Sequence, residues 1–264
     1  MKKRESVEKR HVLRSDDGTR IAVTHYDSGS ESLLLLAPGF WRRRADREIV
    51  FLAAHFSRAG YDVATLDFRG HGDSAGKYTF GREEWRDFVA VARSLAGAHR
   101  SIAALGFSMG GAIAAEAILR APDLPFRALV MISAPADFAR LRPRPWKPAA
   151  WKMMGVGRAL APPRVDWTTF PREKPRAEDA VEKLTLPKLI VTFENDWLVN
   201  PSHGDRLFRS AAAPVERVHL DVGNSLHADA VVRFAPVSFL RVLTEFLNRR
   251  FPASCERGSA VSRR

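Results

Sequence analysis

The stretch Leu105-Gly106-Phe107-Ser108-Met109-Gly110-Gly111 decides the fold of this 264-residue chain. The apolar run of residues 101–105 leads into it, and the alanine-rich run of residues 110–119 leads out of it. A strand, a Gly-x-Ser-x-Gly turn and a helix, in this order, form a nucleophile elbow in which the serine is held in a strained conformation. The glycines are needed where a side chain would collide with the neighbouring strand or helix. We therefore predict that Ser108 is a nucleophile; the alternative is a plain turn that links two elements.

The rest of the chain alternates apolar, strand-like runs with amphipathic helical patterns. This alternation predicts an α/β fold: a mostly parallel sheet with helices on both faces. The Asp-Gly pair at residues 17–18 lies between two β-rich runs and predicts a hairpin, whose two strands form an antiparallel edge. Eight strands are expected in all, and a helix over residues 236–250 closes the fold. The expected strands are residues 11–14, 19–26, 32–37, 61–67, 101–105, 127–133, 187–193 and 216–222.

Residues 137–183 break this alternation. A connection of this length is usually functional or disordered, and its tryptophan, methionine and phenylalanine side chains argue against disorder. We interpret it as a small lid inserted over the strand ends. Residues 1–136 and 184–252 then form the core, and the polar residues 253–264 are expected to be a disordered tail.

Composition excludes several classes of protein. The net charge is +12, but the arginines are spread along the chain, and no nucleic-acid-binding signature accompanies them. Cys255 is the single cysteine, so no intrachain disulfide can form. The N-terminal residues lack the apolar run of a signal peptide, which favours a cytoplasmic location. No metal-ligand cluster or dinucleotide fingerprint is evident, so we expect no metal and no cofactor.

A serine nucleophile needs a base and an acid that orients the base. In enzymes with this elbow the acid and then the histidine follow the serine along the chain. Asp196 follows the strand at residues 187–193, and His227 lies in the loop after the last strand. Asp137 is the alternative acid, because it also follows a buried strand. Glu194 is expected to point elsewhere, and His219 to lie on a face of the last strand.

The developing oxyanion needs two backbone amides. One is the amide of Met109, directly after the nucleophile. The other is expected from Phe40, in the turn Pro38-Gly39-Phe40-Trp41 after the strand at residues 32–37. The run Arg42-Arg43-Arg44 follows this turn. We interpret it as a solvated charge run, with recognition of an anionic head group as the alternative.

Taken together, these motifs resemble the α/β-hydrolase superfamily, in its lysophospholipase-like, monoglyceride-lipase-like and serine-aminopeptidase-like branch. The resemblance covers about residues 33–251. It rests on residues 37–40, the Asp67-Phe-Arg-Gly-His-Gly-Asp-Ser74 loop, residues 106–111, residues 194–201 and His227. Two positions depart from the family pattern: Pro38 stands where histidine is usual before Gly39, and Leu226 stands where glycine is common.

The resemblance implies a serine hydrolase that forms an acyl-enzyme. An aromatic and methionine-rich lid favours a carboxylic ester with an apolar acyl or aryl group, and weak contact of the lid with lipid is a further hypothesis. The alternatives are aminopeptidase, amidase or thioesterase activity on the same scaffold, and a catalytically silent fold used for binding. The expected partner is a small-molecule ester rather than nucleic acid. The residues assigned to the substrate pocket are Trp41, His71, Trp146, Trp151, Met154, Trp167 and Trp197.

Overall fold

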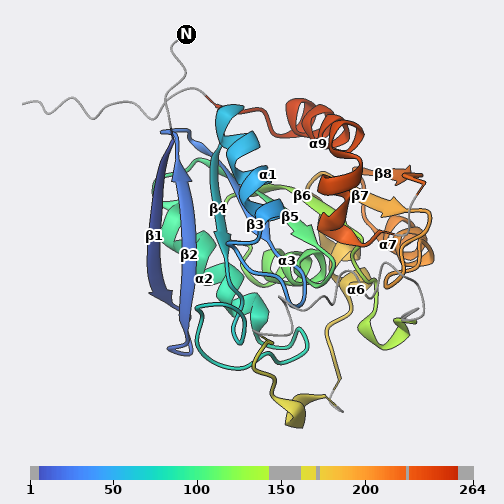
Figure 1. Ribbon diagram of the computed structural model, residues 1–264, viewed down its shortest axis with the longest axis horizontal. Coiled ribbons are helices and arrows are strands. Elements are labelled where there is room, and N and C mark those ends of the chain that lie inside the picture. Colours follow the sequence, from blue (N-terminus) through green and yellow to red (C-terminus); the bar gives the residue numbers. More distant parts are fainter. Residues whose placement is uncertain (1–5, 143–161, 171–172, 224–225, 255–264) are drawn as a thin grey trace, which may run out of the picture.

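Eight strands form one sheet in the order β1-β2-β4-β3-β5-β6-β7-β8 (Figure 1). The structure is a computed structural model that describes residues 6–142, 162–170, 173–223 and 226–254. The strands are β1 (Val7–Arg14), β2 (Arg20–Asp27), β3 (Ser32–Ala37), β4 (Asp62–Leu66), β5 (Ser101–Phe107), β6 (Phe126–Ile132), β7 (Lys188–Phe193) and β8 (Val215–Leu220).

The first two strands form the expected hairpin. Gly18, at φ 83°, allows the tight turn, and the amide of Ser15 donates to the carbonyl of Thr19 at 2.9 Å. β1 pairs antiparallel with β2, which pairs antiparallel with β4, and all remaining pairs are parallel. The predicted α/β class and mostly parallel eight-stranded sheet are therefore confirmed.

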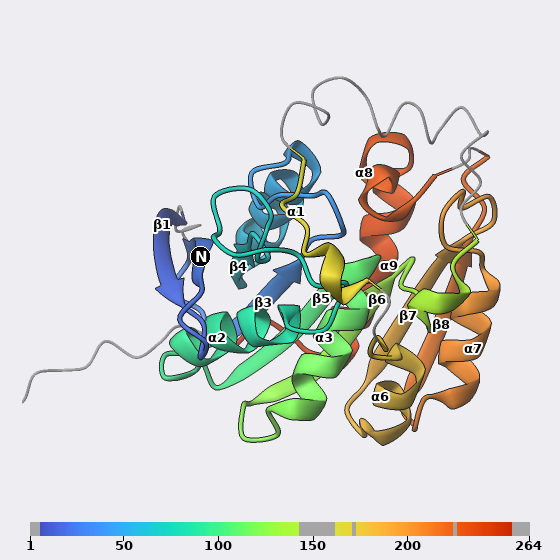
Figure 2. The ribbon, with the colours of Figure 1, turned by 90° about the horizontal axis from the view of Figure 1, so that it is seen from below.

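Helices cover both faces of the sheet (Figure 2). α1 and α9 lie on one face, and α2, α3 and α6 lie on the other. Their bounds are α1 (Arg47–Arg58), α2 (Glu84–Ala96), α3 (Met109–Arg120), α6 (Ala177–Lys183), α7 (Ser202–Ser210), α8 (Val231–Phe234) and α9 (Pro236–Arg250). Short 3₁₀ turns are η1 (Phe138–Arg140), η2 (Trp167–Thr169) and η3 (Ala228–Ala230).

The central strands are apolar on both sides because each side packs against a helical layer. In β3, Leu33 and Leu35 contribute to the core under α2 and α3, whereas Leu34 and Leu36 contribute to the core under α1 and α9. β5 and β6 divide their side chains in the same way. This period-two division explains why the sequence shows continuous apolar runs rather than alternation.

Part of the predicted lid lies against the loop that follows β4. Val165 forms an isolated bridge with Tyr78, and the amide of Arg164 donates to the carbonyl of Gly70 at 2.8 Å. Residues 143–161, the middle of the lid, lie outside the described residues, as do residues 255–264 of the tail. The division into core and lid stays a prediction.

Candidate active site

Ser108 occupies the sharp turn between β5 and α3, at φ 50° and ψ −121°. Residues other than glycine rarely adopt this backbone region, so the turn is strained. The neighbouring glycines allow its tight packing. A Cβ on Gly106 would lie 2.4 Å from the Cα of Gly111, and one on Gly110 would lie 2.2 Å from the carbonyl oxygen of Ala37. The local geometry is that of a nucleophile elbow, which places the serine where β5 ends.

Asp196 and His227 lie in contact, although 31 positions separate them in the chain. The Nδ1 atom of His227 lies 3.0 and 2.9 Å from the two carboxylate oxygens of Asp196, and both side chains are buried. The amides of Leu198 and Val199 donate to Asp196 Oδ1 at 2.8 and 2.9 Å. Two backbone donors therefore fix the carboxylate, which in turn orients the imidazole and leaves Nε2 to exchange protons.

Ser108 and His227 line one cavity of about 210 Å³. No hydrogen bond joins the Ser108 hydroxyl to His227 in this conformation. Catalytic hydrogen bonds are often long or poorly aligned without substrate, so this gap does not argue against their partnership. The structure thus brings the three predicted residues to one place, and their catalytic roles stay a prediction. The cavity is lined by Gly39, Phe40, Trp41, Arg42, Ser108, Trp197, Leu198, His227, Ala228 and Asp229.

The turn at Gly39 packs directly against the elbow. A Cβ on Gly39 would lie 3.4 Å from the Cβ of Ser108 and 3.2 Å from the carbonyl oxygen of Phe107. The amides of Phe40 and Met109 donate to no acceptor within the described residues. An oxyanion hole requires two such amides, and the assignment of Phe40 and Met109 to it stays a prediction.

The alternative acid and histidine lie in other surroundings. Asp137 caps η1 by accepting from the amide of Ala139 at 2.8 Å, and it contacts Arg140 and Arg176 rather than His227. Glu194 pairs with His219, which also bonds Thr192 at 2.9 Å and is about one-third exposed. Glu194 therefore points away from Ser108, as expected, and Asp196 is the acid that contacts the loop histidine.

Known proteins share this architecture. A family model described as serine aminopeptidase, S33, matches residues 47–162, which include the elbow. An esterase from Pyrococcus furiosus is 19% identical, with a TM-score of 0.74, and the match covers 93% of each chain. The α/β hydrolase GrgF from Penicillium sp. sh18 is 16% identical, with a TM-score of 0.76, over 92% of this chain and 99% of that one. A hydrolase from Pseudomonas aeruginosa PA01 is 19% identical, with a TM-score of 0.70, over 90% and 98%.

The family model matches less than half of the chain, and the structural matches, at 16–19% identity, show that it has the α/β-hydrolase fold. The fold that the resemblance of its motifs implied is therefore confirmed. Matches at this identity do not show its substrate. No helix among its described residues is both long and apolar enough to cross a membrane.

The described residues that were assigned to the pocket do not all line the cavity. Trp41 and Trp197 line the cavity, and the Trp197 ring contacts His227 with its centroid 5.9 Å away. Trp167 lies apart from the cavity lining, 69% exposed, against Phe80 and Phe170. The remaining lid residues assigned to the pocket, Trp146, Trp151 and Met154, lie outside the described residues.

His71 is buried behind the cavity rather than in its lining. Its ring contacts Phe40 and Tyr78 with centroids 5.7 and 5.5 Å away, and its Nε2 has no hydrogen-bond partner in the described chain. Through Phe40, His71 supports the turn at residues 38–41. Burial lowers the pKa of His71 to about 4.

This pKa predicts a pH-dependent stability. The unfolded chain protonates His71 near its ordinary pKa of 6.5, whereas the folded protein resists protonation down to about pH 4. The free energy of unfolding should therefore be unaffected by His71 above pH 6.5 and fall between pH 6.5 and 4. Urea unfolding at pH 7 and 4.5 measures this change. The free energy of unfolding should fall less between these two pH values for His71→Gln than for the wild type. An equal loss for both proteins would contradict the prediction, and His219→Gln is the control.

A buried ion-pair network joins the oxyanion turn to the loop of His227, and the sequence patterns did not reveal it. Arg42 donates to Glu48 at 2.7 Å and pairs with Asp229, two residues beyond His227. Glu48 also pairs with Arg233.

The prediction that residues 42–44 form a solvated charge run is wrong for Arg42, which is 5% exposed. It is also wrong for Arg44, whose mostly buried side chain pairs with Asp67 and Asp73. Charge alone did not separate these two arginines from exposed Arg43, because their partners come from other segments.

Removing Arg42 should destabilise the protein strongly. Arg42→Ala leaves the carboxylates of Glu48 and Asp229 buried with fewer partners, and breaking a buried pair typically costs about 3–5 kcal/mol. Arg43→Ala is the matched control, because Arg43 is exposed and should change stability by less than about 0.5 kcal/mol. Urea unfolding of both variants checks the difference. Similar stabilities for Arg42→Ala and Arg43→Ala would show that the network contributes little.

Proposed function

We propose that the protein is a serine hydrolase that cleaves a carboxylic ester through an acyl-enzyme on Ser108. One observation carries the proposal: His227, whose ring contacts buried Asp196, lines the same cavity as a serine held at positive φ at the end of β5. A plain Gly/Ser turn would not require a buried carboxylate–imidazole pair beside it. The fold similarity to proteins described as esterases and hydrolases agrees with this chemistry.

In the proposed mechanism Ser108 Oγ attacks the ester carbonyl while His227 Nε2 takes the hydroxyl proton. Asp196 holds the proton on Nδ1 and stabilises the imidazolium that forms. The amides of Phe40 and Met109 donate to the oxyanion, and His227 then protonates the departing alcohol. Water, deprotonated by His227, attacks the acyl-enzyme and releases the acid and free Ser108.

The cavity lining favours a short apolar acyl or aryl group. Phe40, Trp41, Trp197 and Leu198 are the large apolar side chains of the described lining. The cavity volume of about 210 Å³ is below the usual range for drug-sized ligands. The charged groups in this lining, Arg42 and Asp229, pair with each other. We therefore propose a neutral ester as substrate.

An aminopeptidase or amidase is the second candidate, because the matched family is described as serine aminopeptidase. A peptidase that recognises a free amine needs an acidic group beside the nucleophile. Four acidic residues between 137 and 183 are candidates for this role. Asp166 caps η2, Glu178 pairs with Arg176 and Arg206, and Asp179 lies near Arg176. Glu173 is absent from the described lining of the cavity, as are the other three. The charges therefore favour the ester.

A substrate panel combined with a covalent probe tests the proposal. We expect hydrolysis of p-nitrophenyl esters, fastest for short acyl chains, and slow or no hydrolysis of aminoacyl anilides. A fluorophosphonate should inactivate the wild-type protein with one adduct per chain, and peptide mass analysis should place the adduct on Ser108. Folded protein that neither hydrolyses an ester nor reacts with the probe would support the silent, binding-only fold instead.

Contact of the lid with lipid is a second proposal, separate from ester hydrolysis. Most of the residues that motivate it, 146–160, lie outside the described chain. Among the described lid residues, Trp167 and Phe170 are largely exposed. Co-sedimentation with phosphatidylcholine vesicles that is unchanged by Trp167→Ala would count against a role for these two rings.

A further inference from the structure

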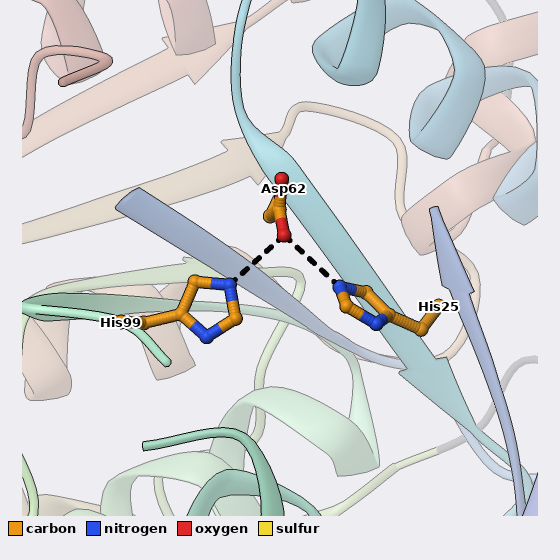
Figure 3. A group of neighbouring side chains, drawn as sticks. All are labelled: His25, Asp62 and His99. Atoms are coloured by element: carbon orange, nitrogen blue, oxygen red, sulfur yellow. Dashed lines mark hydrogen bonds and ion pairs between the residues drawn. The ribbon is translucent and has the colours of Figure 1, made fainter. Parts of the chain in front are cut away.

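Three side chains with metal-binding chemistry meet at the end of the sheet opposite to the cavity. His25 lies on β2, Asp62 begins β4, and His99 lies in the turn between α2 and β5. Figure 3 shows that both imidazoles point to the same carboxylate oxygen of Asp62. The Nε2 atoms of His25 and His99 lie 3.1 and 2.9 Å from Asp62 Oδ2. Because β5 separates His99 from Ser108, the cluster lies about 20 Å from the elbow, at about 3.3 Å per strand residue.

The other oxygen of Asp62 is held by the loop before β3. The amides of Ser28 and Ser30 each donate to Asp62 Oδ1 at 2.9 Å, and the Ser28 hydroxyl donates at 2.8 Å. These three donors hold Oδ1 in place, so Oδ2 is the oxygen directed at the two imidazoles.

A backbone contact fixes the orientation of the His99 ring. Its Nδ1 lies 2.7 Å from the carbonyl oxygen of Leu95, which can only accept, so Nδ1 carries the proton. Metal-ligating histidines almost always donate their second ring nitrogen to a carbonyl or carboxylate in this way. The contact therefore directs Nε2 into the cluster as a potential ligand atom.

We propose that His25, Asp62 and His99 bind one divalent transition-metal ion, with Zn²⁺ as the expected occupant. Their three ligand atoms lie within 4.8 Å of one another and all three residues are buried. Metal–ligand distances of about 2.0–2.2 Å place two ligand atoms of one ion no more than about 4.4 Å apart, so binding draws the most widely spaced of these atoms closer together. Two imidazole nitrogens and one carboxylate oxygen suit Zn²⁺ better than Mg²⁺ or Ca²⁺, which prefer oxygen ligands.

The site fits a structural role. It joins the N-terminal hairpin to β4 and to the turn before β5, and it is remote from Ser108. A metal bound only by the folded protein raises the unfolding temperature with its concentration. The proposal is independent of the ester chemistry, since loss of the metal leaves Ser108, Asp196 and His227 in place.

Zinc binding to untagged, chelator-treated protein tests the site. We expect one Zn²⁺ per chain by elemental analysis after dialysis, and a thermal midpoint that rises with ZnCl₂ concentration. His25→Gln keeps a donor near Asp62 but removes an imidazole ligand. It should weaken Zn²⁺ binding by more than about 10–100-fold, because a loss of that size already follows when a hydrogen-bond partner of a metal ligand is removed. His219→Gln is the matched control, because His219 also pairs with a carboxylate but has no second histidine beside it.

X-ray absorption at the zinc edge of the wild-type protein keeps the test decisive if His25→Gln does not fold. A spectrum with two imidazole nitrogens and carboxylate oxygen in the first shell supports the site. Folded wild type that retains no Zn²⁺ and shows no thermal shift would overturn it and leave a hydrogen-bonded network. Equal binding by His25→Gln and wild type, or a zinc shell without two imidazoles, would overturn it as well.

Discussion

Replacing Ser108 with alanine should lower kcat for ester hydrolysis by about 10⁴–10⁶-fold, because the acyl-enzyme can no longer form. The cavity, the Asp196–His227 pair and the oxyanion amides remain, so KM should change little and some activity above that of water should persist. Stopped-flow and steady-state assays with p-nitrophenyl acetate measure this loss, and the burst of product should disappear.

Ser57→Ala is the control for the Ser108 variant. Ser57 is also a buried serine, but it lies on α1, and its hydroxyl has no hydrogen-bond partner among the described residues. Its replacement should leave kcat within about twofold and stability unchanged or slightly higher, since a buried hydroxyl without a partner is unfavourable. If Ser108→Ala retained wild-type kcat, Ser108 would not be the nucleophile, and the elbow would be a structural turn.

Replacing Asp196 with asparagine should lower kcat by about 10⁴-fold. The asparagine side chain can turn its NH₂ group towards His227 Nδ1, which moves the imidazole proton to Nε2 and removes the base that Ser108 needs. Part of the activity should return at high pH, where the serine ionises without His227. A pH–rate profile from pH 6 to 10 therefore distinguishes a lost base from a general loss of structure.

Asp137→Asn is the matched control, because Asp137 is the alternative acid and also follows a buried strand. It caps η1 and contacts arginines, and asparagine caps a helix as well as aspartate does, so its replacement should leave kcat nearly unchanged and change stability by less than about 0.5 kcal/mol. A large loss of kcat for Asp137→Asn, with Asp196→Asn nearly as active as the wild type, would reassign the acid.

Local patterns were sufficient to predict most of the fold. The ends of α1 and α9 coincide with the ranges where apolar residues recur at helical spacing, and β3 coincides with an unbroken apolar run. The elbow was predictable because Gly106, Ser108 and Gly110 are adjacent in sequence and each is required by a close backbone contact. Asp196 and His227 were predictable because parallel strands bring their C-terminal ends to one edge of the sheet.

Contacts between distant segments were not predictable from local patterns. Arg42 is one of three consecutive arginines, and only its pairing with Glu48 and Asp229 separates it from exposed Arg43. His25, Asp62 and His99 are spaced by 37 residues each, and they meet because β2 and β4 pair in one register. A metal-ligand motif with short spacing would have been recognised, whereas this cluster has no local signature.

The sequence by itself determined the order of strands and helices along the chain, the elbow and the three residues proposed to act there. These features were predictable because the spacing of apolar residues and the residues of tight turns depend on near neighbours in the chain. Tertiary structure alone decided which charged groups are buried, since burial and charge pairing depend on segments that packing brings together. It placed Trp167 on the surface and Trp197 against His227, although both tryptophans had been assigned to the pocket. Tertiary structure also placed Ser108 and His227 in one cavity without a hydrogen bond between their side chains. That arrangement depends on side-chain packing, which no sequence pattern describes.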